Sequence, residues 1–126
     1  GPGRIEAYKR IAAIQIPEDA ADVLDELIDR YGDPPPSVSD LVNVSLARVQ
    51  ATAVGVYEVT QKKDTLVLQV EQLDLRMIQG LLVAFNGRVV TGAGAKPYLS
   101  VTLQKEEKPL ELLQSILRAM QDILKD

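Results

Sequence analysis

The spacing of apolar residues changes at Gly55, and this change constrains the fold more than any other feature of the sequence. Before Gly55, apolar residues recur every three or four positions, which is the period of an amphipathic helix. After Gly55, residues 56–60 and 65–70 are rich in β-branched side chains and follow a period of about two. A chain that places helices before strands in this way favours an α+β fold.

Three helices are predicted before the change. The first covers residues 4–14, in which Ile5, Tyr8 and Ile11 recur at helical spacing. The second begins at Pro17 and is ended by Gly32, which the prolines at 34–36 follow. The third covers about residues 37–54. The predicted inner stripe of the second helix is Ala20, Val23, Leu24, Leu27, Ile28 and Tyr31, and that of the third is Val38, Leu41, Val42, Ser45, Leu46 and Val49.

Strands and helices are both predicted after Gly55. The polar residues 62–64 separate two strands as a hairpin turn, and Asp74 caps a helix over residues 75–85. Residues 88–91 and 98–103 are predicted as two further strands, and Pro109 begins the last helix. We therefore predict an α+β fold: an N-terminal three-helix segment, then a small, mostly antiparallel β-sheet with two further helices packed on it.

The domain organisation is predicted to be simple. The chain has 126 residues and no long segment of linker composition, so we expect residues 4–126 to form a single domain. Residues 1–3 are interpreted as a remnant of tag cleavage, because Gly1 and Pro2 are typical of such remnants.

The composition excludes several classes of function. The chain has no cysteine and no histidine, which removes thiol nucleophiles, imidazole bases and the usual zinc ligands. We expect no metal and no cofactor. No apolar run approaches the ~20 residues of a membrane span, and no signal peptide is recognised. The absence of cysteine fits a reducing compartment, so we expect the protein to be cytoplasmic and to have no membrane partner.

Two candidate catalytic motifs do not fit their chemistry. The glycine-rich residues 91–96 include Lys96, but Pro97 follows and a strand comes next, whereas a phosphate-binding loop requires a helix there. A hairpin turn is the better interpretation. The carboxylates of the second helix lie opposite its apolar stripe, in water, where burial cannot raise a pKa for acid catalysis. We therefore expect no enzymatic activity.

The negative charge of the chain is concentrated in one segment. The net charge is −4, from 14 basic and 18 acidic residues. Residues 17–33 contain seven acids and one base, a net charge of −6, so the other residues carry eleven acids and thirteen bases, a net charge of +2. The basic residues are scattered and stacking aromatics are scarce, which argues against nucleic-acid binding.

The acidic face of the second helix has two interpretations from composition alone. Like charges at i,i+4 repel each other by tenths of a kcal/mol, so the cluster has a cost that a docking surface would explain. Such a surface would orient a basic partner and increase its association rate. A merely solvated helix face explains the same pattern, and composition does not decide between them.

Two motifs make the sequence similar to a known family. Residues 4–11 read Arg-Ile-Glu-Ala-Tyr-Lys-Arg-Ile, and residues 26–32 read Glu-Leu-Ile-Asp-Arg-Tyr-Gly. A proline turn and an apolar helix follow, with Pro35, Ser37, Val38 and Leu41 at the matching places. This arrangement resembles the C-terminal domain of bacterial transcription-repair coupling factors, over nearly the whole chain. Compared with the family pattern, we expect these residues to lack the segment that usually precedes the first helix, the helicase motors and the polymerase-binding module, so the resemblance assigns none of those activities to them.

The resemblance implies a regulatory function rather than a catalytic one. In this family the full-length protein is an ATP-driven DNA translocase that displaces stalled RNA polymerase and recruits UvrA. The terminal domain is expected to dock on the N-terminal UvrB-like module of the same protein, to mask the UvrA-binding surface and to restrain the motor. The positions matching the family contacts are Glu26 and Asp29, and we expect Asp22, Asp25 and Arg30 to form the rim of this surface.

Two other functions stay open at this point. The basic remainder of the chain would serve a nucleic-acid-contacting module, although the acidic helix argues against direct nucleic-acid binding. A scaffold domain that binds another repair or transcription protein is the second alternative. We expect the chain to be a monomer whose partner is intramolecular, with an indirect effect on UvrA recruitment.

Overall fold

The computed structural model describes residues 9–15, 17–32 and 36–125. The chain divides into two compact units, whose boundary falls between Gln50 and Ala51. The predicted tag remnant, the predicted helical residues 4–8 and residues 33–35 of the proline turn lie outside the described residues.

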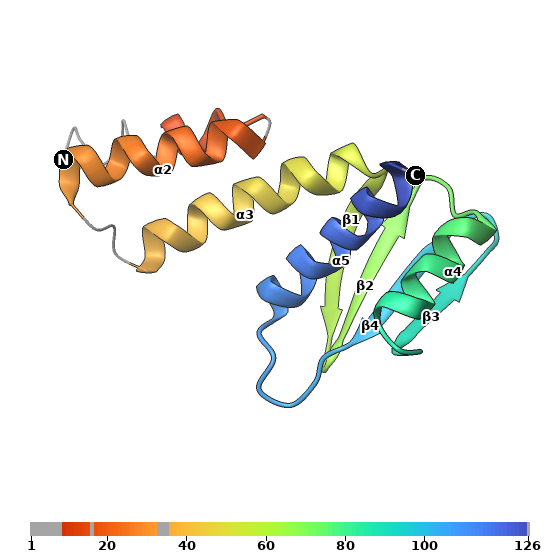
Figure 1. Ribbon diagram of the computed structural model, residues 1–126. Helices are drawn as coiled ribbons and strands as arrows, with labels where there is room; N and C mark the ends of the chain where they lie inside the picture. Colours follow the sequence, from red (N-terminus) through yellow and green to blue (C-terminus); the bar gives the residue numbers. More distant parts are fainter. Residues whose placement is uncertain (1–8, 16, 33–35, 126) are drawn as a thin grey trace. The chain divides into compact units, whose positions relative to one another are not determined.

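The first unit is helical, as the spacing of its apolar residues predicts (Figure 1). Residues 9–12 are helical, followed by α2 (Pro17–Tyr31) and α3 (Pro36–Ala53). Gly32 ends α2 because it adopts a φ of 77°, which favours glycine, and its N–H donates to the carbonyl of Ile28 at 2.8 Å. The predicted limits of α2 are confirmed, and those of α3 are displaced by one residue.

The core of the first unit joins residues 11–14 to one face of α2 and one of α3. Its buried members are Ile11, Ile14, Ala20, Val23, Leu27 and Val42, with Leu46 and Val49 packed against them. The prediction for Leu41 is wrong, because 41% of this residue is exposed. One residue along a helix turns the side chain by about 100°, and the elements that cover Val42 leave the neighbouring Leu41 largely in solvent. Ile28 of α2 is likewise 39% exposed.

The second unit contains a four-stranded antiparallel sheet. The strands are β1 (Val56–Lys62), β2 (Thr65–Val70), β3 (Val89–Gly92) and β4 (Tyr98–Thr102), in the spatial order β1-β2-β4-β3. Both predicted hairpin pairs are present, and β4 lies between β2 and β3. β3 begins one residue later than predicted because the N–H of Arg88 donates to the carbonyl of Phe85, within the turn after α4.

Two helices cover one face of this sheet, α4 (Leu75–Ala84) and α5 (Pro109–Lys125) (Figure 1). Along β2 and β4, burial alternates as a half-covered antiparallel sheet requires, with Leu66, Leu68, Leu99 and Val101 at most 3% exposed. Asp74 caps α4 as predicted, since its carboxylate accepts from the N–H of Met77 at 2.8 Å.

The two helices of the second unit pack closely at Gly80. A Cβ placed on Gly80 would lie 2.5 Å from Cδ1 of Ile123, so glycine permits this approach of α4 and α5. The remaining core residues of α5 are Leu112, Ile116, Leu117 and Met120, each at most 1% exposed. The structure confirms the predicted α+β fold with an antiparallel sheet and two helices packed on it.

Candidate functional site

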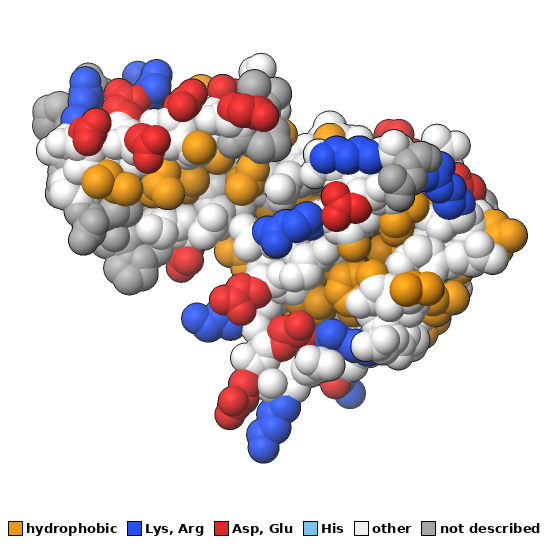
Figure 2. Space-filling model, in the orientation of Figure 1, with side chains coloured by type: hydrophobic (Ala, Val, Ile, Leu, Met, Phe, Trp, Pro, Cys, Tyr) orange, Lys and Arg blue, Asp and Glu red, His pale blue; other side chains and the backbone are white. Residues whose placement is uncertain are grey.

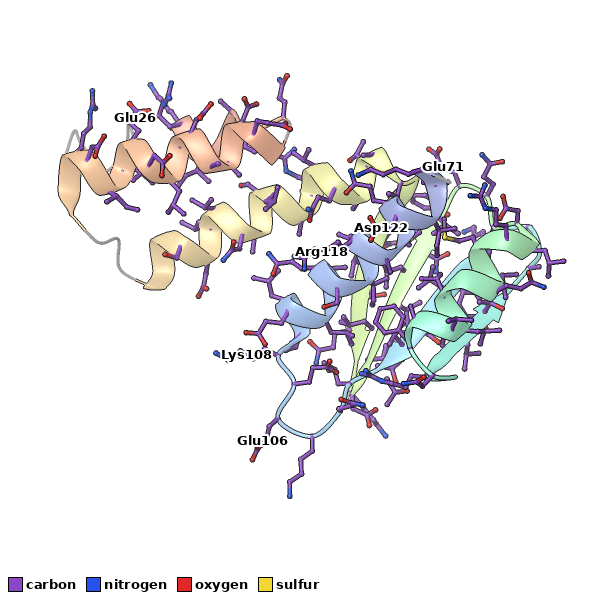
Figure 3. The ribbon with its side chains drawn as sticks, viewed as in Figure 1. Glu26, Glu71, Glu106, Lys108, Arg118 and Asp122 are labelled. Carbon is purple, nitrogen blue, oxygen red and sulfur yellow. The ribbon has the colours of Figure 1, made fainter. Side chains whose placement is uncertain are left out.

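The five predicted partner-binding residues all lie on α2. Figure 2 shows carboxylates gathered along this helix. Asp22, Asp25, Asp29 and Arg30 are exposed, whereas Glu26, labelled in Figure 3, is half-buried. The helix holds them in a fixed relation to one another, because its opposite side is anchored in the core by Ala20, Val23 and Leu27.

The carboxylates occupy two sectors around the axis of α2. At about 100° per residue, Asp22, Asp25 and Asp29 fall on the side opposite Leu27. Glu26 is the residue before Leu27 and falls on the flank, about 100° from it, at the border between core and solvent. We therefore call Asp22, Asp25, Glu26 and Asp29 the acidic face, with Glu26 as its inner edge.

Glu26 has an ion-pair partner from outside its own helix. Nη2 of Arg10, in the helical segment before α2, donates to Oε2 of Glu26. The Arg10 side chain is 56% exposed and the Glu26 side chain 34% exposed. From composition alone Arg10 is one of several scattered bases; its place in segment 4–11, which resembles the family, is the signal in the sequence that points to its pairing with α2.

The outer carboxylates have a different environment. The structure gives no hydrogen bond or ion pair between the side chains of Asp22, Asp25 or Asp29 and any described residue. Spacings of three and four residues place them on successive turns, where like charges repel. The three carboxylates therefore form a row of negative charge on the exposed side of α2.

A hollow of about 180 Å³ adjoins the acidic face. It lies between residues 10–14 and the first turns of α2, and its lining is Arg10, Ala13, Ile14, Asp19, Asp22 and Val23. Asp19 also accepts from the N–H of Gln15 at 3.1 Å, which joins the preceding loop to α2. The hollow combines carboxylates with apolar walls, a combination that suits the methylene stem and charged head of a basic side chain.

A second hollow and an ion pair lie in the other unit. The hollow has a volume of about 350 Å³, and Met77 and Met120 contribute its buried apolar lining. Arg88 donates both to the carbonyl of Thr102 and to Oε1 of Glu107. The N–H of Gln104 donates to the same oxygen at 2.9 Å, and this bond, helped by Arg88, lowers the pKa of Glu107.

The described residues do not form two other kinds of site, a metal centre and a phosphate-binding loop. Among the described residues, no group of three acidic, histidine or cysteine side chains is placed to hold a metal ion. The glycine-rich residues 93–97 connect β3 to β4 as the predicted hairpin turn, and no helix begins there. None of the helices in the described part of the chain combines the length and apolar composition needed to cross a membrane.

Known proteins with similar sequences share one description. Two curated relatives, from two strains of Staphylococcus epidermidis, are transcription-repair-coupling factors that are 27% identical to this chain over 123 residues. The match covers 94% of this chain and 10% of each relative, so the chain spans about a tenth of their length.

A solved structure with a similar fold comes from the same kind of protein as these relatives. A crystal structure of the C-terminal domain of transcription-repair coupling factor matches 99% of this chain and 81% of its own chain, with 26% identity and a TM-score of 0.78. The model of the TRCF domain family matches residues 2–80. Because that match covers more than half of the chain, and the fold agrees, this protein belongs to the TRCF domain family, the C-terminal domain of transcription-repair coupling factor.

Proposed function

We propose that this chain is a non-catalytic regulatory domain of a transcription-coupled DNA repair translocase. In this proposal it docks on the N-terminal UvrB-like module of the same protein, masks the UvrA-binding surface and autoinhibits the full-length protein. The domain thereby controls UvrA recruitment indirectly, and it contributes no chemistry of its own.

The observation that carries the proposal is the row of exposed carboxylates on α2. Asp22, Asp25 and Asp29 have no ion-pair partner among the described residues, although their mutual repulsion has a cost. A basic partner surface would offset that repulsion and would fix the orientation of the complex. In the family, the matching contact positions are Glu26 and Asp29, which belong to the same acidic face.

Each residue has a defined role in the proposal. Glu26 and Asp29 pair with arginines of the UvrB-like module, and Asp22, Asp25 and Arg30 form the rim. An exposed ion pair contributes only about 0.2–1 kcal/mol, so several such pairs set the register while the contact stays reversible. Within one polypeptide, a high effective concentration closes a contact that would be weak between separate molecules.

The test is a titration of this chain with the UvrB-like N-terminal module of the same coupling factor. We expect binding that weakens as salt rises from low to moderate concentration, since screening acts on exposed charges. The double variant Glu26→Lys, Asp29→Lys should bind at least about tenfold more weakly, because two attractive pairs become repulsive. Its circular dichroism spectrum should match that of the parent chain.

The control is a double variant that changes the charge by the same amount in the second unit, outside the acidic face. Glu71 and Asp122 are exposed residues of the second unit, labelled in Figure 3, and Glu71→Lys, Asp122→Lys changes the net charge by the same +4. This control should retain most of the affinity. Equal affinity of the parent chain and the Glu26, Asp29 double variant would contradict the proposal. Salt-dependent DNA binding by the isolated chain would instead favour a nucleic-acid-contacting module.

A further inference from the structure

We propose that Arg10 limits the affinity of the acidic face by occupying Glu26 in the free chain. A basic side chain of the partner must then displace Arg10 before Glu26 can pair across the interface. This inference rests on the proposed docking function, and it adds an internal competitor to it. It assigns a role to a residue that is not part of the predicted docking set.

The geometry places Arg10 at the one acidic-face carboxylate for which the structure gives an ion pair. Nη2 of Arg10 contacts Oε2 of Glu26, and the two residues are 16 positions apart in the sequence. The pair therefore joins two segments of the first unit and is not a product of helical spacing. By contrast, the structure gives Asp22, Asp25 and Asp29 no such pair with any described residue.

The exposure of the pair makes it exchangeable. More than half of the Arg10 side chain and a third of the Glu26 side chain contact solvent. Water can therefore solvate both groups when they separate, and the barrier of burying an unpaired charge does not arise. A second guanidinium can approach Glu26 from the exposed side and replace the first.

The hollow beside the pair is a second reason to expect tighter binding of the partner once Arg10 is displaced. Arg10 lines it together with Asp19 and Asp22, and the other walls are Ala13, Ile14 and Val23. Displacing Arg10 leaves two carboxylates and an apolar wall, which fit the stem and head of an incoming arginine. Removing Arg10 also removes a positive charge that repels a basic partner. Both effects favour tighter binding.

The experiment is a calorimetric titration at low salt with the UvrB-like N-terminal module as the probe. We expect Arg10→Ala to bind about two- to fivefold more tightly than the parent chain, which is the range for an exposed ion pair. Arg10→Gln, which keeps part of the side-chain stem, should bind more tightly as well. Lys9→Ala is the matched control, because it removes one positive charge from the residue next to Arg10. The Lys9 side chain is exposed and forms no ion pair with the described residues.

A double-mutant cycle separates the specific pair from the general charge. On a Glu26→Gln background, Arg10→Ala should lose most of its effect, since there is no carboxylate left to release. If Lys9→Ala tightens binding as much as Arg10→Ala, or if Arg10→Ala binds equally or more weakly than the parent, the inference is wrong. That result would leave the docking function standing if Glu26→Lys, Asp29→Lys still binds at least about tenfold more weakly than the parent chain. Absence of binding by the parent chain and by Arg10→Ala would instead overturn both proposals.

Discussion

Leu27 and Ile28 are adjacent apolar residues of α2 that the sequence assigns to the same stripe, and the structure separates them. Leu27 is 4% exposed and belongs to the core of the first unit, whereas Ile28 is 39% exposed. Glu26 directly precedes Leu27 in the sequence. The residue that stabilises α2 is therefore the direct neighbour of the residue proposed to bind the partner.

Replacing Leu27 should destabilise the first unit. We expect Leu27→Ala to reduce the free energy of unfolding by about 2–5 kcal/mol, because it leaves a cavity that the surrounding helices fill only partly. Ile28→Ala is the control, and it should cost about 1 kcal/mol or less because its side chain is already largely in solvent. Chemical denaturation followed by circular dichroism measures both. A loss for Leu27→Ala no larger than that for Ile28→Ala would contradict the assigned core.

Glu107 should make the stability depend on pH. Its pKa in the folded chain is lowered below the ordinary value of 4.5, first by the N–H of Gln104 and then by Arg88. A carboxyl with a lowered folded pKa stabilises the fold above its unfolded pKa, and this contribution is lost as the pH falls through the folded pKa. We expect Glu107→Gln to cost of order 1 kcal/mol at pH 7 and progressively less below about pH 4.5.

Denaturation of the parent chain and of Glu107→Gln at pH 7 and pH 3 measures this difference. The neighbouring Glu106 is exposed and has no hydrogen-bond or ion-pair partner among the described residues, so Glu106→Gln is the control and should cost less stability at pH 7 than Glu107→Gln. A Glu107→Gln penalty that stays constant from pH 7 to pH 3 would mean that the carboxylate charge does not stabilise the fold.

At the scale of the elements, the approach of α4 to α5 depends on a residue without a side chain. A Cβ on Gly80 would meet Cδ1 and Cγ1 of Ile123 at 2.5 and 2.7 Å. Helix propensity alone disfavours glycine in this position by about 1 kcal/mol relative to alanine, so packing rather than propensity explains it. The sequence pattern of α4 gives no indication of this contact.

Filling that position should separate the two helices. We expect Gly80→Val to reduce the free energy of unfolding by about 1–3 kcal/mol, through overpacking against Ile123. Gln79→Val places the same β-branched side chain at the adjacent, exposed position, and it shows the effect of that side chain on α4 without overpacking against Ile123. Thermal melts compare the two. If the melting temperature of Gly80→Val equals or exceeds that of Gln79→Val, α5 accommodates the added side chain with no loss of stability.

At the scale of the whole molecule, the chain forms two compact units, yet α3 belongs to both. Val42 of this helix lies in the core of the first unit, and Ala51 is a buried residue that belongs to the second unit. A continuous helix that supplies residues to both units favours their joint unfolding. The expectation of a single domain over residues 4–126 stays a prediction.

The cooperativity of unfolding tests that expectation. We predict one transition, with the same midpoint for a probe in α2 and for a probe in the β-sheet, because α3 crosses the boundary and its melting would remove residues from both units. Hydrogen exchange of amides in α2 and in β2 provides the two probes. Midpoints that differ between them would show that the units unfold separately and that residues 4–126 contain two domains.

Local features of the sequence were sufficient for the elements and for the acidic face. Pro17, Gly32, Asp74 and Pro109 act on their own helix ends, through a cap, a left-handed turn or a fixed φ, and the structure confirms each of these ends. The side of α2 that carries Asp22, Asp25 and Asp29 follows from helical periodicity, which needs no knowledge of distant residues.

Contacts between distant residues were decided only by the tertiary structure. The position of β4 between β2 and β3, the closeness of Gly80 to Ile123 and the pairing of Arg10 with Glu26 join segments whose spacing carries no repeating pattern. The exposure of Leu41 has the same origin, because an apolar residue is buried only where another element covers it. Periodicity specifies which face of an element is apolar, whereas packing decides which part of that face is covered.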